Sequence, residues 1–299
     1  METQQEPRQI VVLSGKGGTG KTSVTAALVD LASQDLPLVI ADADVDAANL
    51  DLVLRPKRIA SHTFKSGLEA RIDPDLCTGC GRCYVACRFG AVIPDPERGP
   101  YRIDPLACEG CNACTYHCPV NAIQTSEPQV GEWYESETPY GPLYHAYLFA
   151  GGDNSGKLVT MVKQQARLRA LDDRRPLVLV DGPPGIGCPV ISAVSGASLA
   201  LLVVEPTPAG VHDLRRVLQL TAHFGVPAEV VINKWDLNET RTREIEDFCR
   251  SQAVASVTRI PYDNSVTEAM VQGEPITAYQ DGPVSEALRA LWGTIRATG

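Results

Sequence analysis

Short runs of apolar residues alternate with amphipathic stretches along most of the chain. Five runs rich in Val, Ile and Leu lie at residues 9–15, 37–44, 176–185, 199–207 and 228–236. Stretches with helical spacing of apolar residues lie at residues 22–34, 154–171, 210–225 and 239–252. Strands that are buried on both faces have continuous apolar runs. The alternation therefore predicts an α/β fold, in which helices sandwich a mostly parallel sheet.

A segment rich in Cys, Gly and Pro interrupts this alternation at residues 67–128. Within it, residues 71–92 match residues 102–123 at ten of 22 positions, including four cysteines. We therefore expect a small duplicated α+β module inserted into the larger fold. The predicted domains are residues 1–66, the first part of the α/β domain; 67–128, the insert; and 129–299, the second part, which begins with a predicted β-hairpin at 131–151.

The loop after the first apolar run has the pattern G-x-x-x-x-G-K-[ST], which is typical of phosphate-binding loops. Its residues are Gly15, Lys16, Gly17, Gly18, Thr19, Gly20, Lys21 and Thr22. Glycines let backbone N–H groups approach phosphate oxygens, and the N-terminus of the following helix adds partial positive charge. We expect Lys21 to contact the β- and γ-phosphates of a nucleotide, and the Thr22 hydroxyl to ligate Mg²⁺.

Both halves of the repeat contain the spacing C-x₂-C-x₂-C-x₃-C, for which disulfides, zinc and iron–sulfur clusters are the alternatives. Zinc sites mostly use separated C-x₂-C pairs, whereas this run is typical of ferredoxins with two [4Fe–4S] clusters. In those proteins the fourth cysteine of each run ligates the other cluster. The predicted ligand sets are Cys77, Cys80, Cys83 and Cys118 for one cluster, and Cys87, Cys108, Cys111 and Cys114 for the other. Arg88 replaces the Pro of the motif, which removes no ligand.

Composition and charge narrow the classes of function. The formal net charge is −9 and the pI is near 5.1, which argues against a general nucleic-acid surface. No apolar run reaches the length of a transmembrane helix, and the polar start METQQEPRQ lacks a signal-peptide core. We therefore expect a cytoplasmic protein without stable membrane insertion. Structural disulfides are rare in that compartment, so ten cysteines indicate metal or redox chemistry.

With Lys16, the loop reads KGGTGKT, which resembles the deviant phosphate loop of the MinD/ParA/Mrp and nitrogenase iron-protein superfamily. The resemblance implies that Lys16 reaches the nucleotide of a second subunit, so that ATP closes a homodimer or a heterodimer with a related ATPase. It also implies that Asp44 orients the attacking water, which makes Lys16, Lys21 and Asp44 the expected catalytic residues. Thr22, Asp44 and Asp181 are the expected Mg²⁺ residues.

The sequence Asn233-Lys234-Trp235-Asp236 does not decide whether the bound nucleotide is ATP or GTP. N-K-x-D reads guanine in GTPases, whereas the Asn at this strand end contacts adenine in MinD-like proteins. The resemblance favours ATP, with Asn233 at the base. It also implies that residues 260–276, which include Pro261, line the base pocket. GTP is the alternative.

The combined motifs resemble MinD-superfamily ATPases with an inserted ferredoxin domain. That group implies ATP, Mg²⁺, two [4Fe–4S] clusters and slow hydrolysis. The expected function couples nucleotide state to electron transfer or to metal or iron–sulfur cluster assembly, with a redox or metal-cluster client protein. The insert follows the first switch strand in the sequence, which suggests that nucleotide state and electron transfer influence each other. The alternative is a redox-sensing spatial organiser like MinD or ParA.

Two further cysteines and the C-terminal stretch complete the sequence predictions. Cys188 lies seven residues after Asp181, and a cysteine at this spacing in the nitrogenase iron protein binds a cluster shared between subunits. Cys188 is thus a possible extra ligand; the alternative is a small residue packed in a Gly/Pro turn. Cys249 has helical spacing with Ile245 and is a predicted core residue. MinD binds membranes through a C-terminal amphipathic helix. Here basic residues are sparse in the stretch 284–296, so we expect a helix packed on the sheet.

Overall fold

A large, mostly parallel sheet forms the centre of the protein. The computed structural model describes residues 6–97, 99–152 and 154–298, and the polar residues 1–5 lie outside this range. Within the described residues, nine strands form one sheet in the order β13-β12-β11-β1-β10-β2-β9-β8-β3. Every neighbouring pair from β13 to β9 is parallel, which confirms the predicted α/β sheet. The strands are β1 Arg8–Ser14, β2 Leu38–Asp42, β3 Lys57–Lys65, β8 Gln129–Thr138, β9 Gly141–Leu148, β10 Leu177–Pro184, β11 Leu199–Val204, β12 Ala228–Asn233 and β13 Val257–Ile260.

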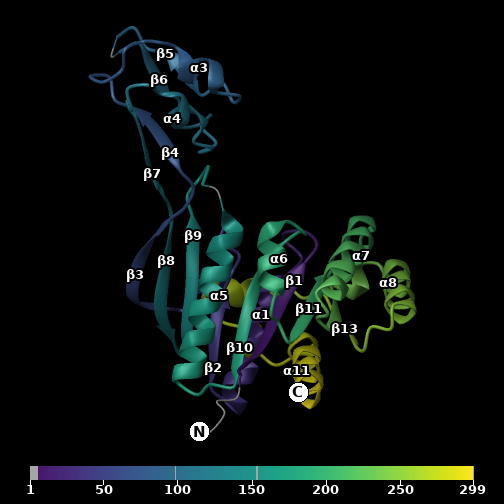
Figure 1. The fold of residues 1–299 in the computed structure, drawn as a ribbon. Coiled ribbons are helices and arrows are strands. Elements are labelled where there is room, and N and C mark those ends of the chain that lie inside the picture. Colours follow the sequence, from purple (N-terminus) through teal and green to yellow (C-terminus); the bar gives the residue numbers. More distant parts are fainter. Residues whose placement is uncertain (1–5, 98, 153, 299) are drawn as a thin grey trace. The chain divides into compact units, whose positions relative to one another are not determined.

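Helices cover both faces of this sheet (Figure 1). They are α1 Lys21–Asp35, α2 Leu50–Leu54, α5 Ser155–Asp172, α6 Cys188–Val194, α7 Pro208–His223, α8 Glu239–Ser251, α9 Ser265–Gln272, α10 Ile276–Tyr279 and α11 Pro283–Ala297. Side chains alternate between the faces along each strand. Ile10 and Val12 of β1 pack in one core cluster with α1 and α11, whereas Leu202 of β11 lies with α7. Helices α5 and α6 pack against each other and against β10.

The C-terminal helix α11 is part of the core of the sheet domain. Its apolar residues Val284, Leu288, Leu291, Trp292 and Ile295 are all buried, and they share a cluster with β1 and α1. This placement confirms the prediction of a helix packed on the sheet. An apolar face that is already buried in the core is not available to a membrane in this conformation.

The described chain divides into two compact units. The first comprises Met1–His62, Trp133–Tyr147 and Ser155–Gly299, and the second comprises Thr63–Glu132 and Leu148–Asn154. The chain passes from one unit to the other within β3, β8 and β9 and again before α5. The second unit therefore includes the cysteine-rich repeat together with short flanking segments.

Both halves of the repeat form the same elements. The first half contains β4 Glu69–Ile72, α3 Arg82–Ala86 and β5 Val92–Pro94; the second contains β6 Tyr101–Ile103, α4 Ala113–His117 and β7 Ile123–Ser126. Strand β4 pairs with β7, with Ile72 opposite Ile123, and β5 pairs with β6, with Val92 opposite Ile103. The repeat offset of 31 residues relates the two strand pairs: Ile72 corresponds to Ile103, and Ile123 corresponds to Val92. The halves are thus interleaved by an approximate two-fold symmetry, and each contributes strands to both small sheets.

The structure differs from the sequence predictions at some strand ends. The strand expected at residues 37–44 ends at Asp42, and the one expected at 228–236 ends at Asn233 and is followed by a short 3₁₀ helix, Trp235–Leu237. At the first of these ends Asp42 binds the backbone of the following loop, which stops the strand. Strand β3 was not predicted, because Phe64 is the only buried residue in it and the strand has no apolar run.

We predict that Leu288→Ala lowers the free energy of unfolding by roughly 2–5 kcal/mol, because it opens a cavity under α11. Denaturant unfolding measures the effect. Ala290→Ser, on the exposed side of the same helix, is the matched control and is expected to change stability little. Equal effects of the two substitutions would show that α11 does not pack in the core in solution.

Candidate functional site

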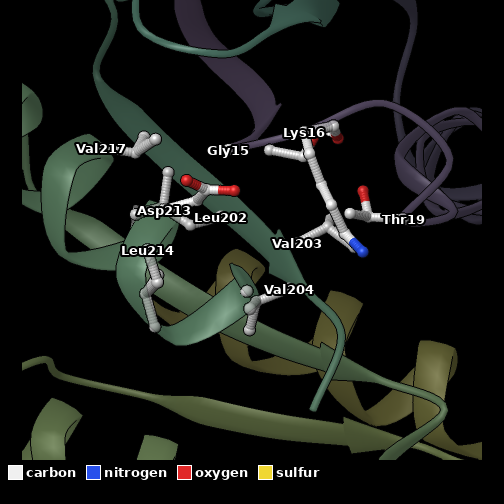
Figure 2. Close-up of a pocket in the computed structure, with 11 residues that line it drawn as sticks. Gly15, Lys16, Thr19, Leu202, Val203, Val204, Asp213, Leu214 and Val217 are labelled. Atoms are coloured by element: carbon white, nitrogen blue, oxygen red, sulfur yellow. Dashed lines mark hydrogen bonds between the residues drawn. The ribbon is translucent and has the colours of Figure 1, made fainter. Parts of the chain in front are cut away.

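The predicted phosphate-binding loop connects β1 to α1 and passes close to two other elements. Gly20 has a φ of 88° and precedes the first residue of α1. A Cβ atom added at Gly20 would collide with the side chain of Asn233, and one added at Gly15 would collide with Asp213 of α7. Figure 2 shows Gly15, Lys16 and Asp213 around the small cavity behind the loop. Glycine is therefore required here by close packing as well as by backbone conformation.

Lys21 is buried between two carboxylates. Its Nζ lies 3.2 Å from Oδ2 of Asp44 and 3.1 Å from Oδ1 of Asp181. Asp181 also accepts hydrogen bonds from the hydroxyls of Thr22, at 2.8 Å, and Thr25, at 2.9 Å. The structure thus brings together Lys21, Thr22, Asp44 and Asp181, which were predicted from separate parts of the sequence.

A third carboxylate, Asp42, lies fully buried beside this group. Its oxygens accept hydrogen bonds from the backbone N–H groups of Asp44, at 3.1 Å, and Leu50, at 3.0 Å. Burial and the nearby charge of Asp181 raise the pKa of Asp42 to about 8. Burial also raises the pKa of Asp44, although Lys21 opposes this shift. With this pKa Asp42 is largely protonated at neutral pH, but the two carboxylates of Asp44 and Asp181 still outnumber the single ammonium of Lys21, which favours a divalent cation.

The described residues contain no group of three or more His, Cys, Asp or Glu side chains arranged to hold a metal ion. Mg²⁺ does not require such a group of side chains, because it is usually bound by one or two carboxylates, substrate phosphates and water. The hydroxyl of Thr22 and the carboxylate of Asp181, which are already hydrogen-bonded to each other, fit that chemistry.

Lys16 contacts a carboxylate of its own chain. Its Nζ lies 3.3 Å from Oε2 of Glu205, whose other oxygen lies 2.8 Å from Nζ of Lys234. Burial opposes ionisation of Glu205, but the two lysines outweigh it and lower its pKa. The sequence analysis did not identify Glu205 as a partner of Lys16. The expected role of Lys16 across a dimer stays a prediction.

The loop that carries Asp44 has a further contact that the sequence did not indicate. The hydroxyl of Tyr147, near the end of β9, donates to the backbone oxygen of Ala48 at 3.3 Å and to Oδ2 of Asp51 at 3.2 Å. Tyr147 lies about a hundred residues from this loop in the sequence, so the contact depends on the pairing of β2 with β9. Tyr147 and Asp42 together hold the loop from two sides.

The residues predicted at the base lie next to the loop. Nδ2 of Asn233 donates to the backbone oxygen of Thr19 at 2.8 Å. Oδ1 of Asp236 accepts a hydrogen bond at 2.8 Å from the backbone N–H of Tyr262, the residue after Pro261. Each carboxylate oxygen can accept a further hydrogen bond, so this contact does not distinguish adenine from guanine. The base contacts and the choice of ATP stay predictions.

Two cavities of the second unit each gather four cysteines. One is lined by Cys77, Cys80, Cys83 and Cys118, together with Ile72, Tyr101 and Ile123. The other is lined by Cys87, Cys108, Cys111 and Cys114, together with Ala70, Val92 and Ile103. In both cavities three cysteines come from one half of the repeat and the fourth comes from the other half. This grouping is the one expected from the spacing.

The backbone around these cysteines is shaped in the same way in both halves. Gly79 and Gly110, which lie within the two C-x₂-C pairs, have φ values of 72° and 62°. The backbone N–H of Ala122 donates to Sγ of Cys118 at 3.2 Å. Burial raises the pKa of the equivalent thiol of Cys87, but backbone N–H groups of residues 89–92 outweigh it and lower this pKa overall. Donors aimed at the sulfur favour thiolates, the form that ligates metals.

Zinc and four-iron clusters require different arrangements of four cysteines. Zinc would hold all four sulfurs about 2.3 Å from one point. The described residues show no cluster of that kind, and the eight cysteines are free of disulfides. A four-iron cluster binds its four thiolates at different corners, so its ligands lie farther apart. The cavity linings are compatible with the second kind of group.

The two remaining cysteines lie in the sheet unit. Cys188 is exposed at the first residue of α6, and Cys249 is fully buried in α8. Burial raises the pKa of Cys249 to about 11. The predicted core position of Cys249 is confirmed. The exposed position of Cys188 excludes the alternative of a residue packed within the turn, while its role as an extra ligand stays a prediction.

Within the described residues, no helix has both the length and the apolar character needed to cross a membrane.

Comparison with known proteins gives consistent matches. Residues 10–276 match the CobQ/CobB/MinD/ParA nucleotide binding domain family. An uncharacterised protein of Methanocaldococcus jannaschii is 31% identical over 290 residues, which cover 96% of this chain and 96% of the relative. The cell division ATPase MinD of Pyrococcus furiosus has the same fold with a TM-score of 0.59 and 22% identity, covering 98% of this chain and 99% of that one. The septum site-determining protein MinD of Pyrococcus horikoshii, complexed with Mg-ADP, gives a TM-score of 0.59 and 19% identity, covering 97% and 96%.

We predict that Asp44→Asn stabilises the nucleotide-free protein while it slows hydrolysis. The substitution removes one of three crowded carboxylates and should raise the free energy of unfolding by roughly 0.5–1 kcal/mol at neutral pH. Burial raises the pKa of Asp44 in the folded protein, so its ionised form opposes folding only above the carboxyl pKa of the unfolded chain, about 3.9. The gain should therefore disappear as the pH falls below about 4.

Denaturant unfolding at several pH values measures the stability, and phosphate release measures turnover, which should fall by at least about 100-fold. Asp46→Asn, at an exposed position two residues further on, is the matched control for both measurements. A less stable Asp44→Asn protein would contradict the excess of negative charge at the site.

Proposed function

This chain belongs to the CobQ/CobB/MinD/ParA nucleotide-binding family, and we propose that it is an ATP-hydrolysing protein whose nucleotide state is coupled to two [4Fe–4S] clusters. The observation that carries the proposal is the crossed grouping of cysteines, three from one half of the repeat and one from the other, in each of two cavities of a chain that also contains an intact phosphate-binding loop. The clusters serve electron transfer or the assembly of a metal or iron–sulfur cluster on a client protein.

Hydrolysis relies on residues that the structure already brings together. Lys21 would contact the β- and γ-phosphates, while Thr22 and Asp181 would hold Mg²⁺, which supplies charge neutralisation at the phosphates. Asp44 would orient the attacking water. In the structure Nζ of Lys21 lies 3.2 Å from Oδ2 of Asp44, so phosphate oxygens would compete with Asp44 for this lysine. Phosphate binding thereby frees the Asp44 carboxylate to act on water.

ATP is the proposed nucleotide. Asn233 lies at the phosphate-binding loop, where it donates to Thr19, and the similar MinD of Pyrococcus horikoshii is complexed with an adenine nucleotide, Mg-ADP. Faster turnover of GTP than of ATP would contradict this choice.

The second unit fits a module that its clusters stabilise. Its core consists of Ala70, Ile72, Val92 and Ile123 together with Cys83 and Cys114, and the other cysteines of the two cavities pack against it or lie exposed. Modules of this size seldom fold on so small an apolar core without disulfides, metals or other staples. Removal of iron is therefore expected to unfold this unit and to leave the sheet unit folded.

A spatial organiser like MinD is the second candidate function. It is favoured by the similar structures, which are named as cell division and septum site-determining proteins. In this chain the apolar face of α11 is buried in the core, so membrane binding would need a different segment or a rearranged helix. Uniform distribution of a fluorescent fusion in cells of the source organism, with and without ATP hydrolysis, would argue against an organiser.

We predict that Lys16→Ala lowers ATP turnover by about 10³-fold or more, the effect known for charges supplied across an interface. Nucleotide affinity of the monomer should change little, because Lys16 points to Glu205 of its own chain and Lys21 supplies the phosphate contact. Turnover measured against protein concentration tests the dimer: the specific activity of the native protein should rise with concentration. Lys157→Ala, on the surface of α5, is a matched control. Concentration-independent turnover would contradict action across a dimer.

We predict that Cys87→Ser disrupts the cluster of Cys108, Cys111 and Cys114, although Cys87 belongs to the other run. Iron content should fall from about eight to about four atoms per chain, with the remaining cluster that of the first set. Anaerobic reconstitution followed by iron and sulfide analysis measures this loss. Cys249→Ser, in the core of the sheet unit, is the control and should keep all the iron. Full iron content in Cys87→Ser would overturn the crossed ligand sets.

A further inference from the structure

The contact of Tyr147 with the loop after Asp44 lies where the chain leaves the sheet unit. Tyr147 is the last residue of this unit on β9, and Leu148 already belongs to the second unit. The Tyr147 hydroxyl lies 3.3 Å from the backbone oxygen of Ala48 and 3.2 Å from Oδ2 of Asp51. The residue that holds the loop is therefore also the residue that precedes the crossing between units.

The two acceptors of Tyr147 compete for one proton. A phenol has a single O–H group, and both distances exceed the usual O–H···O range of about 2.5–3.0 Å. Burial and the charge of Asp51 raise the pKa of Tyr147 to about 12, so the phenol stays a donor at neutral pH. Oδ1 of Asp51 is buried and has no hydrogen-bond partner among the described residues. A small movement of the loop thus decides whether the proton goes to Ala48 or to Asp51.

The residues that follow Tyr147 are tied into the second unit. The backbone N–H of Phe149 donates to the oxygen of Val130 at 2.8 Å, and that of Gly152 donates to the oxygen of Phe149 at 2.8 Å. A Cβ atom added at Gly152 would lie only 2.8 Å from the oxygen of Val130. Val130 follows strand β7, whose first residue, Ile123, lines the cavity of the first cysteine set.

Strand β9 is packed tightly just before this crossing. His145 pairs with Asp42 in the parallel register of β9 and β2, and its Nε2 lies 3.1 Å from Oγ of Ser136. The ring of Tyr134 packs against the rings of His145 and Tyr147, with centroid distances of 5.1 Å and 6.2 Å. Close-packed interiors transmit displacements because they have little free space to absorb them. A displacement at Tyr147 is therefore passed along the strand.

We propose that Tyr147 is the positioning residue through which the nucleotide state reaches the cysteine-rich unit, a proposal that rests on the function proposed above. When phosphates displace Asp44 from its lysine, the loop carries the oxygen of Ala48 away from the Tyr147 hydroxyl. The hydroxyl then donates to Asp51 alone, and residues 148–152 are held less firmly. The loop is the two-state element that such coupling requires. By linkage, a change in residues 148–152 also shifts the loop.

The test is hydrogen exchange of the iron-loaded protein, with and without Mg²⁺ and a non-hydrolysable ATP analogue. The amides of Phe149 and Gly152 report on the segment because both are hydrogen-bonded. In the native protein the nucleotide should speed their exchange by about fivefold, the factor that one hydrogen bond typically supplies. Tyr147→Phe keeps the ring and lacks the hydroxyl, so exchange should be equally fast with and without nucleotide.

Two further variants make the test specific. Tyr144→Phe is the matched control: it removes a phenol hydroxyl from the opposite face of the same strand, where its partner is Arg169, and it should keep the fivefold response. Asp51→Ala should enlarge the response, because the Tyr147 hydroxyl then has no second acceptor when the loop moves. A second measurement is the ATP hydrolysis rate before and after reduction by dithionite, whose ratio should become one in Tyr147→Phe and stay native in Tyr144→Phe.

The outcomes separate this proposal from the proposed function. If nucleotide changes the exchange of residues 44–50 but not that of Phe149 and Gly152, the role of Tyr147 is overturned and the ATPase is left intact. An equal response in the native protein and Tyr147→Phe, or an equal loss in Tyr147→Phe and Tyr144→Phe, would also overturn it. Absence of any response at residues 44–50 in the native protein would overturn the displacement of Asp44 and this proposal together.

Discussion

The nucleotide site depends on one buried ammonium group among three carboxylates. Lys21 lies within 3.2 Å of Asp44 and Asp181, and Asp42 lies behind them without access to water. Burying a charge is costly unless it is paired, and here one positive charge serves several negative ones. The imbalance suits a cation and phosphate together, because Mg²⁺ would supply the missing positive charge while phosphates would occupy Lys21. In the proposed mechanism Asp44 would change partner when a nucleotide binds, so the loop from Asp44 to Asn49 would respond to the state of the site.

In the second unit, symmetry is the organising constraint. The two halves of the repeat exchange strands, and this exchange explains why the fourth cysteine of each run lies with the first three of the other. The same offset of 31 relates Gly79 to Gly110 and Gly81 to Asn112, all with positive φ. Positive φ at Asn112 is tolerated because a short polar side chain adopts this conformation at low cost. The crossed cysteine sets are thus a consequence of the duplication.

Much of the fold and the centre of the site could be predicted from the sequence. The phosphate loop, the strand end at Asp42 and the Asp of the apolar run that forms β10 have local patterns, and parallel pairing places Asp181 beside Asp42. The contacts of Glu205 with Lys16 and of Tyr147 with Asp51 could not be predicted, because they join residues far apart through pairings that no local pattern specifies. Strand β3 was missed because an exposed strand lacks the apolar periodicity on which such predictions rest. The grouping of the cysteines, in contrast, could be predicted, because the same C-x₂-C-x₂-C-x₃-C spacing occurs in each half of the repeat.

The central claim is that nucleotide hydrolysis and cluster oxidation state influence each other within one chain. It is tested most directly by the ATP hydrolysis rate of one anaerobic, iron-loaded sample, measured before reduction, after reduction with dithionite, and after reoxidation. The account predicts that the rate changes on reduction and returns on reoxidation, and that the rate of a protein lacking both clusters does not respond. Equal rates in all three states of the loaded protein would contradict it, and would leave the clusters as structural elements or as part of an independent electron path.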